Sequence, residues 1–372
     1  MTLPGQATKE GTERYRNRFS GRLPREHFHE SQGLWLSSIG MGTYLGNHDA
    51  ETDRLYHDAA VRAVESGCNV IDTAINYRFQ RSERSIGAAL KTLAAKGFSR
   101  EEIVIATKGG FIPYDGMPPP DARAYFAETF AKPGIADLSD VVAGCHCMTA
   151  NYLRHQIDCS LKNLDLECID FYYVHNPETQ LGKVSRTEFN ERLKLAFKAL
   201  ENAVSAGKIH YYGTATWNGY HNEPHAQDYL SLAEVVGLAI EAGGKSHHLR
   251  AVQLPVNLGM TEALSLLNQT VNGQPTTALS AAQALGLTVM CSASILQGQL
   301  ARNLPSIISE TFSSLETDGQ RALQFVRSTP GVSSALVGMK LLHHVDENLR
   351  TARVPPADWE QFSKLFRAEE QT

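Results

Sequence analysis

The chain has 372 residues, of which 42% are hydrophobic and 20% charged, and its formal net charge is -5. This composition predicts a globular protein with a sizeable core, and it gives no electrostatic reason to expect nucleic acid as a partner. No apolar run approaches the ~20 residues that cross a bilayer, and no signal-peptide pattern opens the chain, so we expect a cytoplasmic protein without a membrane contact.

From about residue 37, short β-branched runs alternate with longer amphipathic segments, as in repeated βα units. We expect strands over 37–42, 69–74, 103–108, 169–175, 208–214, 250–257, 287–294 and 333–339. We expect helices over 53–66, 82–96, 151–163, 188–206, 227–241, 276–284, 316–327 and 345–350. Eight such units predict a (β/α)8 TIM barrel. An open doubly wound sheet would normally carry G-x-G-x-x-G after its first strand, and this chain has none there.

Three segments depart from the βα rhythm. Residues 1–30 form an N-terminal extension, which we expect to be solvated or loosely packed rather than a binding arm, and the barrel takes 31–372. Residues 111–148 are an insertion on the catalytic face, after the third strand. A third segment, 293–312, follows the seventh strand in a region where many barrels hold phosphate groups, and there it would cover a cofactor.

The insertion is rich in proline, glycine and aromatic residues, and two interpretations of it stay open. It is either a lid or substrate wall, or a packed segment without ligand contact. The rings of Tyr114, Tyr125, Phe126 and Phe130 fit a wall for a sugar ring or aryl aldehyde and fit core packing equally well.

The cysteines do not indicate a disulfide framework or a metal site. All six are scattered through the expected elements (Cys68, Cys145, Cys147, Cys159, Cys168 and Cys291), so we expect reduced thiols. Cys145, His146 and Cys147 stand together, but a structural zinc site needs a fourth ligand and usually wider ligand spacing. We therefore predict no metal.

Polar residues end three of the apolar strands, at the barrel rim where catalytic groups gather. Asp72, Lys108 and His175 occupy these positions, and Tyr77 follows Asp72 in the next loop. Taken singly, each has an ordinary structural explanation as a cap, a snorkelling side chain, a packed ring or a rim histidine.

Together the four residues supply what carbonyl reduction by hydride needs. Tyr77 would donate a proton to the carbonyl oxygen, and Lys108 would lower the tyrosine pKa. Asp72 would hold Lys108, and His175 would hydrogen-bond the same oxygen and stabilise its developing charge.

The chain also resembles the aldo-keto reductase family. The resemblance rests on GMGTY at 40–44, IDTAINY at 71–77, SERSIGAAL at 82–90, ATKGG at 106–110, IDFYYVHNP at 169–177, GKIHYYGTATW at 207–217, VQLPVN at 252–257, TPGVSSALVGMK at 329–340 and HVDEN at 344–348. These motifs follow the family order over nearly the whole chain. The family's Asp, Tyr, Lys and His tetrad falls on Asp72, Tyr77, Lys108 and His175.

The resemblance implies NADP or NAD bound in extended form across the barrel mouth. Carried over by motif, the cofactor-binding residues are Gly42, Thr43, Tyr44, Asp72, Thr216, Gln253, Ser292, Ile295, Gly298, Gly338, Lys340, His344, Glu347 and Asn348. Gln253 would bind the nicotinamide carboxamide, and Glu347 and Asn348 would meet the adenine.

The chain departs from the family pattern at both ends of the cofactor site, and the departure at the adenosine end keeps the choice between NAD and NADP open. Ser292 stands where an aromatic ring often stacks on the nicotinamide, with Tyr212, Trp217 and Phe312 as candidate substitutes. Gly338 and His344 stand where NADP-selective members often have Lys and Arg, and histidine is a weaker, pH-dependent partner for a phosphate.

We expect an NAD(P)-dependent oxidoreductase that reduces an aldehyde or ketone reversibly, acting on a small carbonyl compound or sugar. The alternative is a cofactor-binding sensor or interaction module with little turnover, because fold alone does not establish catalysis.

Overall fold

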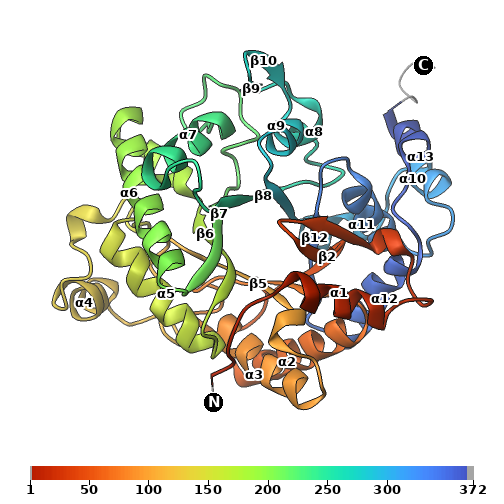
Figure 1. Ribbon diagram of the computed structural model, residues 1–372, viewed down its shortest axis with the longest axis horizontal. Coiled ribbons are helices and arrows are strands. Elements are labelled where there is room, and N and C mark those ends of the chain that lie inside the picture. Colours follow the sequence, from red (N-terminus) through yellow and green to blue (C-terminus); the bar gives the residue numbers. More distant parts are fainter. Residues whose placement is uncertain (1, 367–372) are drawn as a thin grey trace.

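A closed barrel of eight parallel strands forms the centre of the molecule (Figure 1). The structure is a computed structural model and describes residues 2–366, so residue 1 of the expected extension and residues 367–372 of the expected barrel lie outside the described residues. The barrel strands are β3 (Ile39–Gly42), β4 (Val70–Asp72), β5 (Val104–Gly109), β6 (Ile169–His175), β7 (Ile209–Ala215), β8 (Leu249–Pro255), β11 (Thr288–Ser292) and β12 (Ser334–Gly338). Their order around the ring is β11-β12-β3-β4-β5-β6-β7-β8. The predicted (β/α)8 barrel is confirmed.

Helices lie outside this ring and follow the strands along the chain (Figure 1). They are α2 (Ala50–Glu65), α3 (Arg81–Ala95), α5 (Ala150–Leu164), α6 (Arg186–Ser205), α7 (Leu232–Gly243), α9 (Ala278–Ala284), α11 (Asp318–Ser328) and α12 (Leu342–Arg350). Each expected helix has a counterpart. The helix expected over 227–241 begins later, at Leu232, because the Ser231 side chain accepts from Glu234 N and caps it there.

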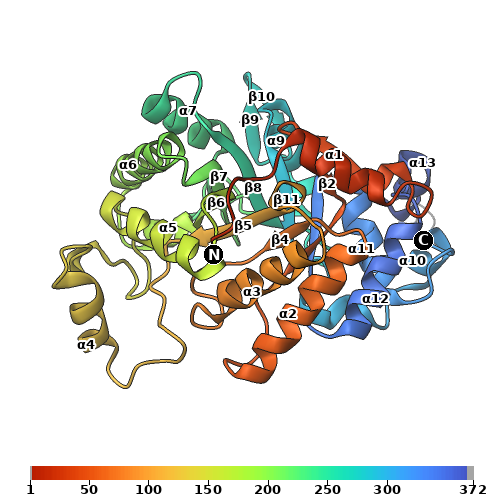
Figure 2. The same cartoon turned by 60° about the horizontal axis from the view of Figure 1, so that its bottom comes forward.

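Further short elements interrupt the barrel, and the sequence did not predict them. They are α1 (Lys9–Arg18), the antiparallel pair β1 (Phe28–Ser31) and β2 (Leu34–Ser37), α4 (Ala122–Phe126), α8 (Glu262–Ser265), the pair β9 (Gln269–Val271) and β10 (Gln274–Thr276), α10 (Ser306–Thr311) and α13 (Trp359–Ser363). In both ribbon views α4 lies at the periphery, on a segment that projects from the body of the molecule (Figure 2).

The N-terminal segment is packed, so the expectation of a solvated or loosely packed extension was wrong. Tyr15 is fully buried, with its ring tilted against Phe19 and edge-on to Phe28, and its hydroxyl donates to the main-chain oxygen of Val64 at 2.6 Å. Arginines of this segment also contact the barrel, because Arg14 pairs with Glu101 at the surface and Arg18 pairs with the buried Glu102. An amphipathic helix thus covers apolar surface that the barrel would otherwise expose.

A buried ion pair ties this segment to the amino-terminal ends of the strands. The Asp170 carboxylate, near the start of β6, accepts from Ala7 N and from Arg100 Nη2, each at 2.7 Å, and from Ile105 N at 2.7 Å. Neither charged side chain is appreciably exposed. This end of the barrel is therefore occupied by structural contacts, which leaves the opposite end for ligands.

Within residues 2–366, none of the helices is both long enough and apolar enough to cross a membrane.

Candidate active site

A cavity of about 710 Å³ opens at the carboxyl ends of the strands. The last residues of six barrel strands line it, namely Gly42, Asp72, His175, Ala215, Ser292 and Gly338. Its volume lies in the range of about 300–1,000 Å³ that small-molecule sites occupy. The position is the one where TIM barrels place their reactive groups.

Three of the four expected catalytic side chains make direct contact at the end of this cavity. Lys108 Nζ lies 2.6 Å from Asp72 Oδ2, and it also donates to the main-chain oxygen of Thr73 at 2.8 Å. The same nitrogen is 3.4 Å from the Tyr77 hydroxyl. Lys108, on β5, therefore faces the Asp72 carboxylate at the end of the neighbouring strand β4 and the Tyr77 phenol in the loop that follows β4.

The pKa values of Lys108 and Tyr77 are both raised in this cluster. Burial lowers the pKa of Lys108, but Asp72 and Tyr77 together raise it overall, so the side chain stays an ammonium. Burial raises the pKa of Tyr77 by more than Lys108 lowers it. The pKa of Tyr77 therefore lies above its ordinary value, and Lys108 acts on it in the expected direction, by lowering it. Tyr77 is a neutral phenol at neutral pH.

His175 completes the cluster from the end of β6. Its ring lies edge-on to Tyr77, with 5.9 Å between ring centroids. Burial, with Lys108 and His146 adding to it, holds the pKa of His175 well below its ordinary value. The imidazole is therefore neutral and suited to donate a hydrogen bond to a carbonyl oxygen.

Every residue that the sequence assigned to cofactor binding lines this same cavity: Gly42, Thr43, Tyr44, Asp72, Thr216, Gln253, Ser292, Ile295, Gly298, Gly338, Lys340, His344, Glu347 and Asn348. The three aromatic residues proposed as substitutes for a ring at the Ser292 position lie in different parts of the structure. Tyr212 and Phe312 are buried elsewhere in the core, whereas Trp217 lines the cavity and is 42% exposed.

The expected loop after the seventh strand reaches the cavity. Ser294, Ile295, Gln297, Gly298 and Ala301 all line it. Gln297 and Gly298 adopt left-handed backbone, with φ of 54° and 90°. A turn of this kind directs consecutive backbone amides toward one side, which suits the binding of an anionic group.

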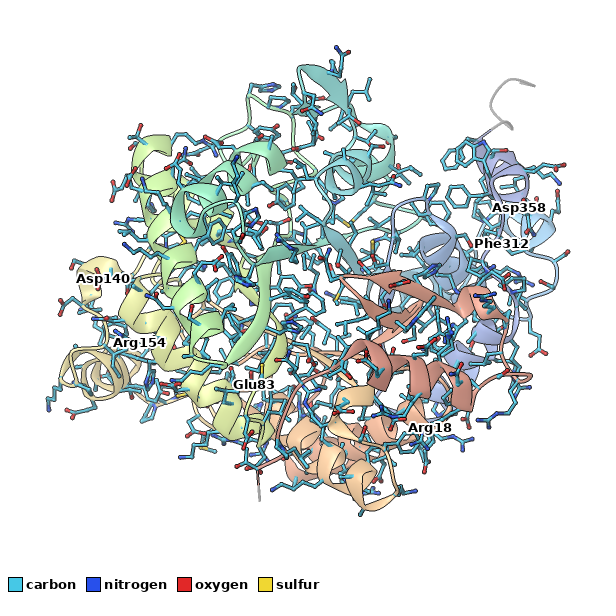
Figure 3. All side chains as sticks on the ribbon, in the orientation of Figure 1. Arg18, Glu83, Asp140, Arg154, Phe312 and Asp358 are labelled. Carbon is cyan, nitrogen blue, oxygen red and sulfur yellow. The ribbon has the colours of Figure 1, made fainter. Side chains whose placement is uncertain are left out.

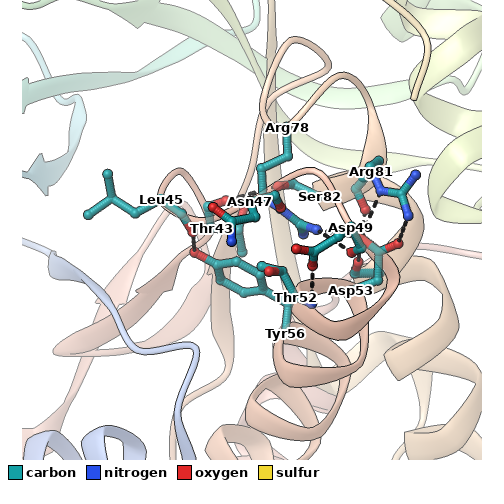
Figure 4. Close-up of polar contacts among 11 residues, drawn as sticks. Thr43, Leu45, Asn47, Asp49, Thr52, Asp53, Tyr56, Arg78, Arg81 and Ser82 are labelled. Carbon is teal, nitrogen blue, oxygen red and sulfur yellow. Dashed lines mark hydrogen bonds and ion pairs between the residues drawn. The ribbon is translucent and has the colours of Figure 1, made fainter. Parts of the chain in front are cut away.

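A second loop, between β3 and α2, is held in place by Arg78 (Figure 4). Its guanidinium donates to the main-chain oxygen of Asn47 at 2.7 Å and to the Asp53 carboxylate. Tyr56 donates its hydroxyl to the main-chain oxygen of Leu45 in the same loop. Arg78 directly follows Tyr77 and has a left-handed φ of 49°. Its hydrogen bond to Asn47 holds the loop that carries Tyr77 against the loop that carries Tyr44, and its ion pair with Asp53 holds it against α2.

The aromatic rings of the insertion pack against one another and not against the cavity. Tyr114, Tyr125, Phe126 and Phe130 form a chain of ring contacts with centroid separations of 5.4–6.1 Å, and Phe130 continues it to Tyr152 on α5. The wall interpretation is wrong for these four rings. From this segment Phe111 alone, among the described residues, lines the cavity. Farther out, Asp140 of the insertion and Arg154 of α5 lie at the edge of the molecule (Figure 3).

Cys145, His146 and Cys147 do not converge on a common point for a metal. His146 is buried and hydrogen-bonded, and Cys147 is buried beside Thr149. Across residues 2–366 there is no group of three or more His, Cys, Asp or Glu side chains that could hold a metal ion.

The sequence of the barrel matches one known family over half of the chain. Residues 38–223 match the sequence model of the Aldo/keto reductase family. The chain is an aldo-keto reductase by family.

Two reductases align with the chain over part of their length. It is 27% identical over 198 residues to 6-dehydroglucose reductase of Novosphingobium aromaticivorans, which is 50% of this chain and 49% of that protein. It is 28% identical over 207 residues to NADH-specific methylglyoxal reductase of Escherichia coli, which is 54% of each. The aligned segment thus spans about half the length of these relatives.

Solved aldo-keto reductase structures share the fold over most of the chain. One from Klebsiella pneumoniae, in complex with NADP and acetate, has a TM-score of 0.59 at 19% identity and covers 91% of this chain and 93% of its own. Another from Bacillus halodurans, in a holo form, has a TM-score of 0.60 at 18% identity, with coverages of 92% and 94%.

Several residues that line the cavity of this aldo-keto reductase were not predicted from its sequence. Asn176 directly follows β6 and Phe111 lies two residues after the end of β5, so their place after a strand end was a usable signal. Leu45 and Asn76 carried no comparable signal, because each sits in an irregular loop whose path the sequence pattern does not specify.

Proposed function

We propose that this protein is an NAD(P)H-dependent oxidoreductase that reduces an aldehyde or ketone to an alcohol, reversibly. The observation that carries the proposal is the meeting of Lys108 with both Asp72 and Tyr77 at the end of a cavity that His175 also lines. Family membership supports the same reaction class.

The cavity fits a nicotinamide dinucleotide. At Gly298 and Gly338, an added Cβ would meet no atom within 4 Å, so the backbone there is open to close approach by a ligand. The buried Thr216 hydroxyl has no hydrogen-bond partner within residues 2–366, which leaves it available to a bound group. Both NADP and NAD are compatible, and the named relatives and neighbours include proteins of both kinds. When bound, the cofactor supplies the hydride.

The side chains of the cluster perform the proton chemistry. The Tyr77 hydroxyl donates its proton to the carbonyl oxygen and becomes a phenolate, which the Lys108 ammonium stabilises at short range. Asp72 holds Lys108 in place through the 2.6 Å contact. The neutral imidazole of His175 donates a hydrogen bond to the same oxygen and stabilises the negative charge that develops on it.

The substrate we propose is a small carbonyl compound or a sugar. Tyr44, Phe111 and Trp217 place three aromatic rings on the cavity wall, and Asn176 adds an amide. The names of two relatives, 6-dehydroglucose reductase and NADH-specific methylglyoxal reductase, support this class of substrate. We also propose a cytoplasmic location, because all six cysteines lie in the described part of the chain as free thiols.

A two-step experiment tests the proposal. Fluorescence titration with NADPH and NADH would measure cofactor binding, and a panel of aldehydes, ketones and sugars would then be assayed in both directions. We expect Tyr77→Phe to bind cofactor within about twofold of the wild type and to lose reduction by at least about a hundredfold. Full activity in Tyr77→Phe would disprove the proton-donor assignment. Cofactor binding without turnover of any compound would favour the sensor alternative, which nothing in the comparisons supports.

A further inference from the structure

His146, in the insertion that the family motifs do not cover, contacts the backbone of His175. It is fully buried, and its Nε2 lies 2.7 Å from the main-chain oxygen of His175. Burial lowers the pKa of His146 to about 4, so the ring is neutral at physiological pH. The two residues are far apart in sequence, and this hydrogen bond joins the insertion to the end of β6.

The neighbours of His146 determine which of its nitrogens carries the proton. Gln180 Nε2, which can only donate, lies 2.9 Å from His146 Nδ1. Arg192 Nη1 donates to Gln180 Oε1 at 2.8 Å, and this contact identifies the amide oxygen and fixes the amide orientation. His146 Nδ1 is therefore the acceptor and Nε2–H the donor, so a directed chain of hydrogen bonds runs from α6 to the backbone of His175.

Packing against Phe111 and Gly110 fixes the positions of the imidazole rings of His146 and His175. The ring of Phe111 stands perpendicular to His146 and to His175, with centroid separations of 5.3 and 5.0 Å. Gly110 has a φ of 140°, and an added Cβ there would lie 2.8 Å from His146 Nε2 and 3.1 Å from the His175 oxygen. The backbone at Gly110 thus passes so close to the hydrogen bond that only glycine fits.

The ring of His175 has no hydrogen-bonded support through its own Nδ1. That atom is buried and has no partner within residues 2–366. The position of the ring is therefore set by its backbone and by the flanking rings. A group that orients a carbonyl has to hold its place within about 0.5 Å, and a displacement of 1 Å can reduce the rate by about a hundredfold.

We propose that His146 is a positioning residue for His175, with Gln180 as the group that keeps His146 in its donating tautomer. This inference rests on the proposed function, since it assigns His146 to the orientation of the carbonyl. The insertion then contributes to the reaction in two ways. It supplies the buried hydrogen bond from His146 to the backbone of His175, and it places the ring of Phe111 on the cavity wall.

Two substitutions at His146 test the proposal on the full-length protein. His146→Leu removes the donor, and we expect kcat for reduction to fall ten- to a hundredfold while the dissociation constant for NADPH or NADH, measured by fluorescence, stays within twofold. His146→Gln offers an amide N–H in place of the imidazole N–H and should keep kcat within about threefold of the wild type. His155→Leu is the matched control, because His155 packs on Phe130 away from the cavity.

Gln180→Leu provides a second, independent variant should His146→Leu fail to fold. It frees His146 to adopt the other tautomer, and we expect a fall in kcat of about three- to tenfold without loss of cofactor affinity. The proposal would be overturned by a kcat within twofold of the wild type in folded His146→Leu. It would also be overturned if cofactor affinity fell in parallel with kcat, or if His146→Gln were as impaired as His146→Leu.

Imidazole resonances give a readout that does not need turnover. In NMR spectra, the His175 ring signals should shift or broaden in His146→Leu and stay unchanged in His155→Leu. Unchanged His175 signals in His146→Leu would contradict the positioning role. A wild-type protein that turns over no compound would refute the proposed function instead, and the NMR result would still decide whether His146 positions His175.

Discussion

Gln253 donates a hydrogen bond from Nε2 to Oδ1 of Asp72, at 2.8 Å across the barrel mouth. The other oxygen of the same carboxylate accepts from Lys108. Both Asp72 oxygens are thus paired, each with a different neighbour. Gln253 was expected to bind the nicotinamide carboxamide, and its place on the cavity wall allows its amide oxygen to accept from that group while its nitrogen stays on Asp72.

Gln253→Leu should therefore weaken cofactor binding and the catalytic cluster together. The change leaves one buried Asp72 oxygen without a donor and removes an acceptor from the cavity, at a cost of about 1–3 kcal/mol. We expect the dissociation constant for the cofactor to rise about tenfold, measured by fluorescence titration. Gln324→Leu is the control, because Gln324 is also buried but donates to Pro355 far from the cavity. An unchanged dissociation constant in Gln253→Leu would contradict a role for this amide.

The raised pKa of Tyr77 predicts opposite pH dependences for the two directions. Reduction needs the protonated phenol, and the shift above the ordinary value of about 10 keeps it protonated through the neutral and mildly alkaline range. Reduction should stay flat from about pH 6 to 9 and decline above that. Oxidation needs the phenolate, so its rate should rise with pH into the alkaline range. Initial rates in both directions check this, and a decline of reduction centred below about pH 8 would be inconsistent with it.

The buried Asp170 carboxylate should contribute strongly to stability. It accepts from Arg100 and from Ala7, so it links the N-terminal segment to the barrel. Asp170→Asn leaves the Arg100 charge buried without its partner, and we expect the free energy of unfolding to fall by about 3 kcal/mol, measured by chemical denaturation.

The exposed pair of Arg54 with Asp58, at 3.3 Å, supplies the control for Asp170→Asn. Asp58→Asn should cost less than about 1 kcal/mol, because solvent screens exposed pairs. Equal losses in the two variants would show that burial of the Asp170 pair does not matter.

The barrel and its reactive rim were predictable because both follow from local patterns. The alternation of β-branched and amphipathic runs specifies the units, and a polar residue at the end of an apolar strand, such as Asp72 or His175, points to the rim. Tyr15 and Phe19, four residues apart, also offered a helical signal for the N-terminal segment. The surrounding arginines obscured it.

The supporting contacts were not predictable, because they join segments that are far apart in the chain. His146 and His175 meet only after the insertion has folded back on β6, and Ala7 meets Asp170 across a sequence separation of 163 residues. No periodicity encodes such pairs. The left-handed backbone conformation of Arg78 could not be predicted from the sequence either. Arginine rarely adopts this conformation unless surrounding contacts, here with Asn47 and Asp53, stabilise it.

Lys340 should decide how strongly this protein distinguishes NADPH from NADH. Of the described residues that line the cavity, it is the one lysine or arginine. Burial, with His343 adding to it, lowers the pKa of the neighbouring His344, so that ring is uncharged at neutral pH. Glu347 accepts from Thr317 at 2.6 Å and adds negative charge nearby. A 2′-phosphate at this end of the cavity would therefore depend on a single ammonium group.

Lys340→Met removes that group and should weaken NADPH binding about tenfold, the equivalent of one charge-assisted hydrogen bond of roughly 1.4 kcal/mol, while NADH binding changes by less than about twofold. Fluorescence titration of both cofactors at two salt concentrations gives the comparison, and the NADPH loss should shrink at high salt because ions screen the phosphate. Lys132→Met serves as the control, since Lys132 lies exposed in the insertion beside Glu128. If Lys340→Met weakened both cofactors equally, Lys340 would instead contact a part of the ligand that the two share, such as the pyrophosphate.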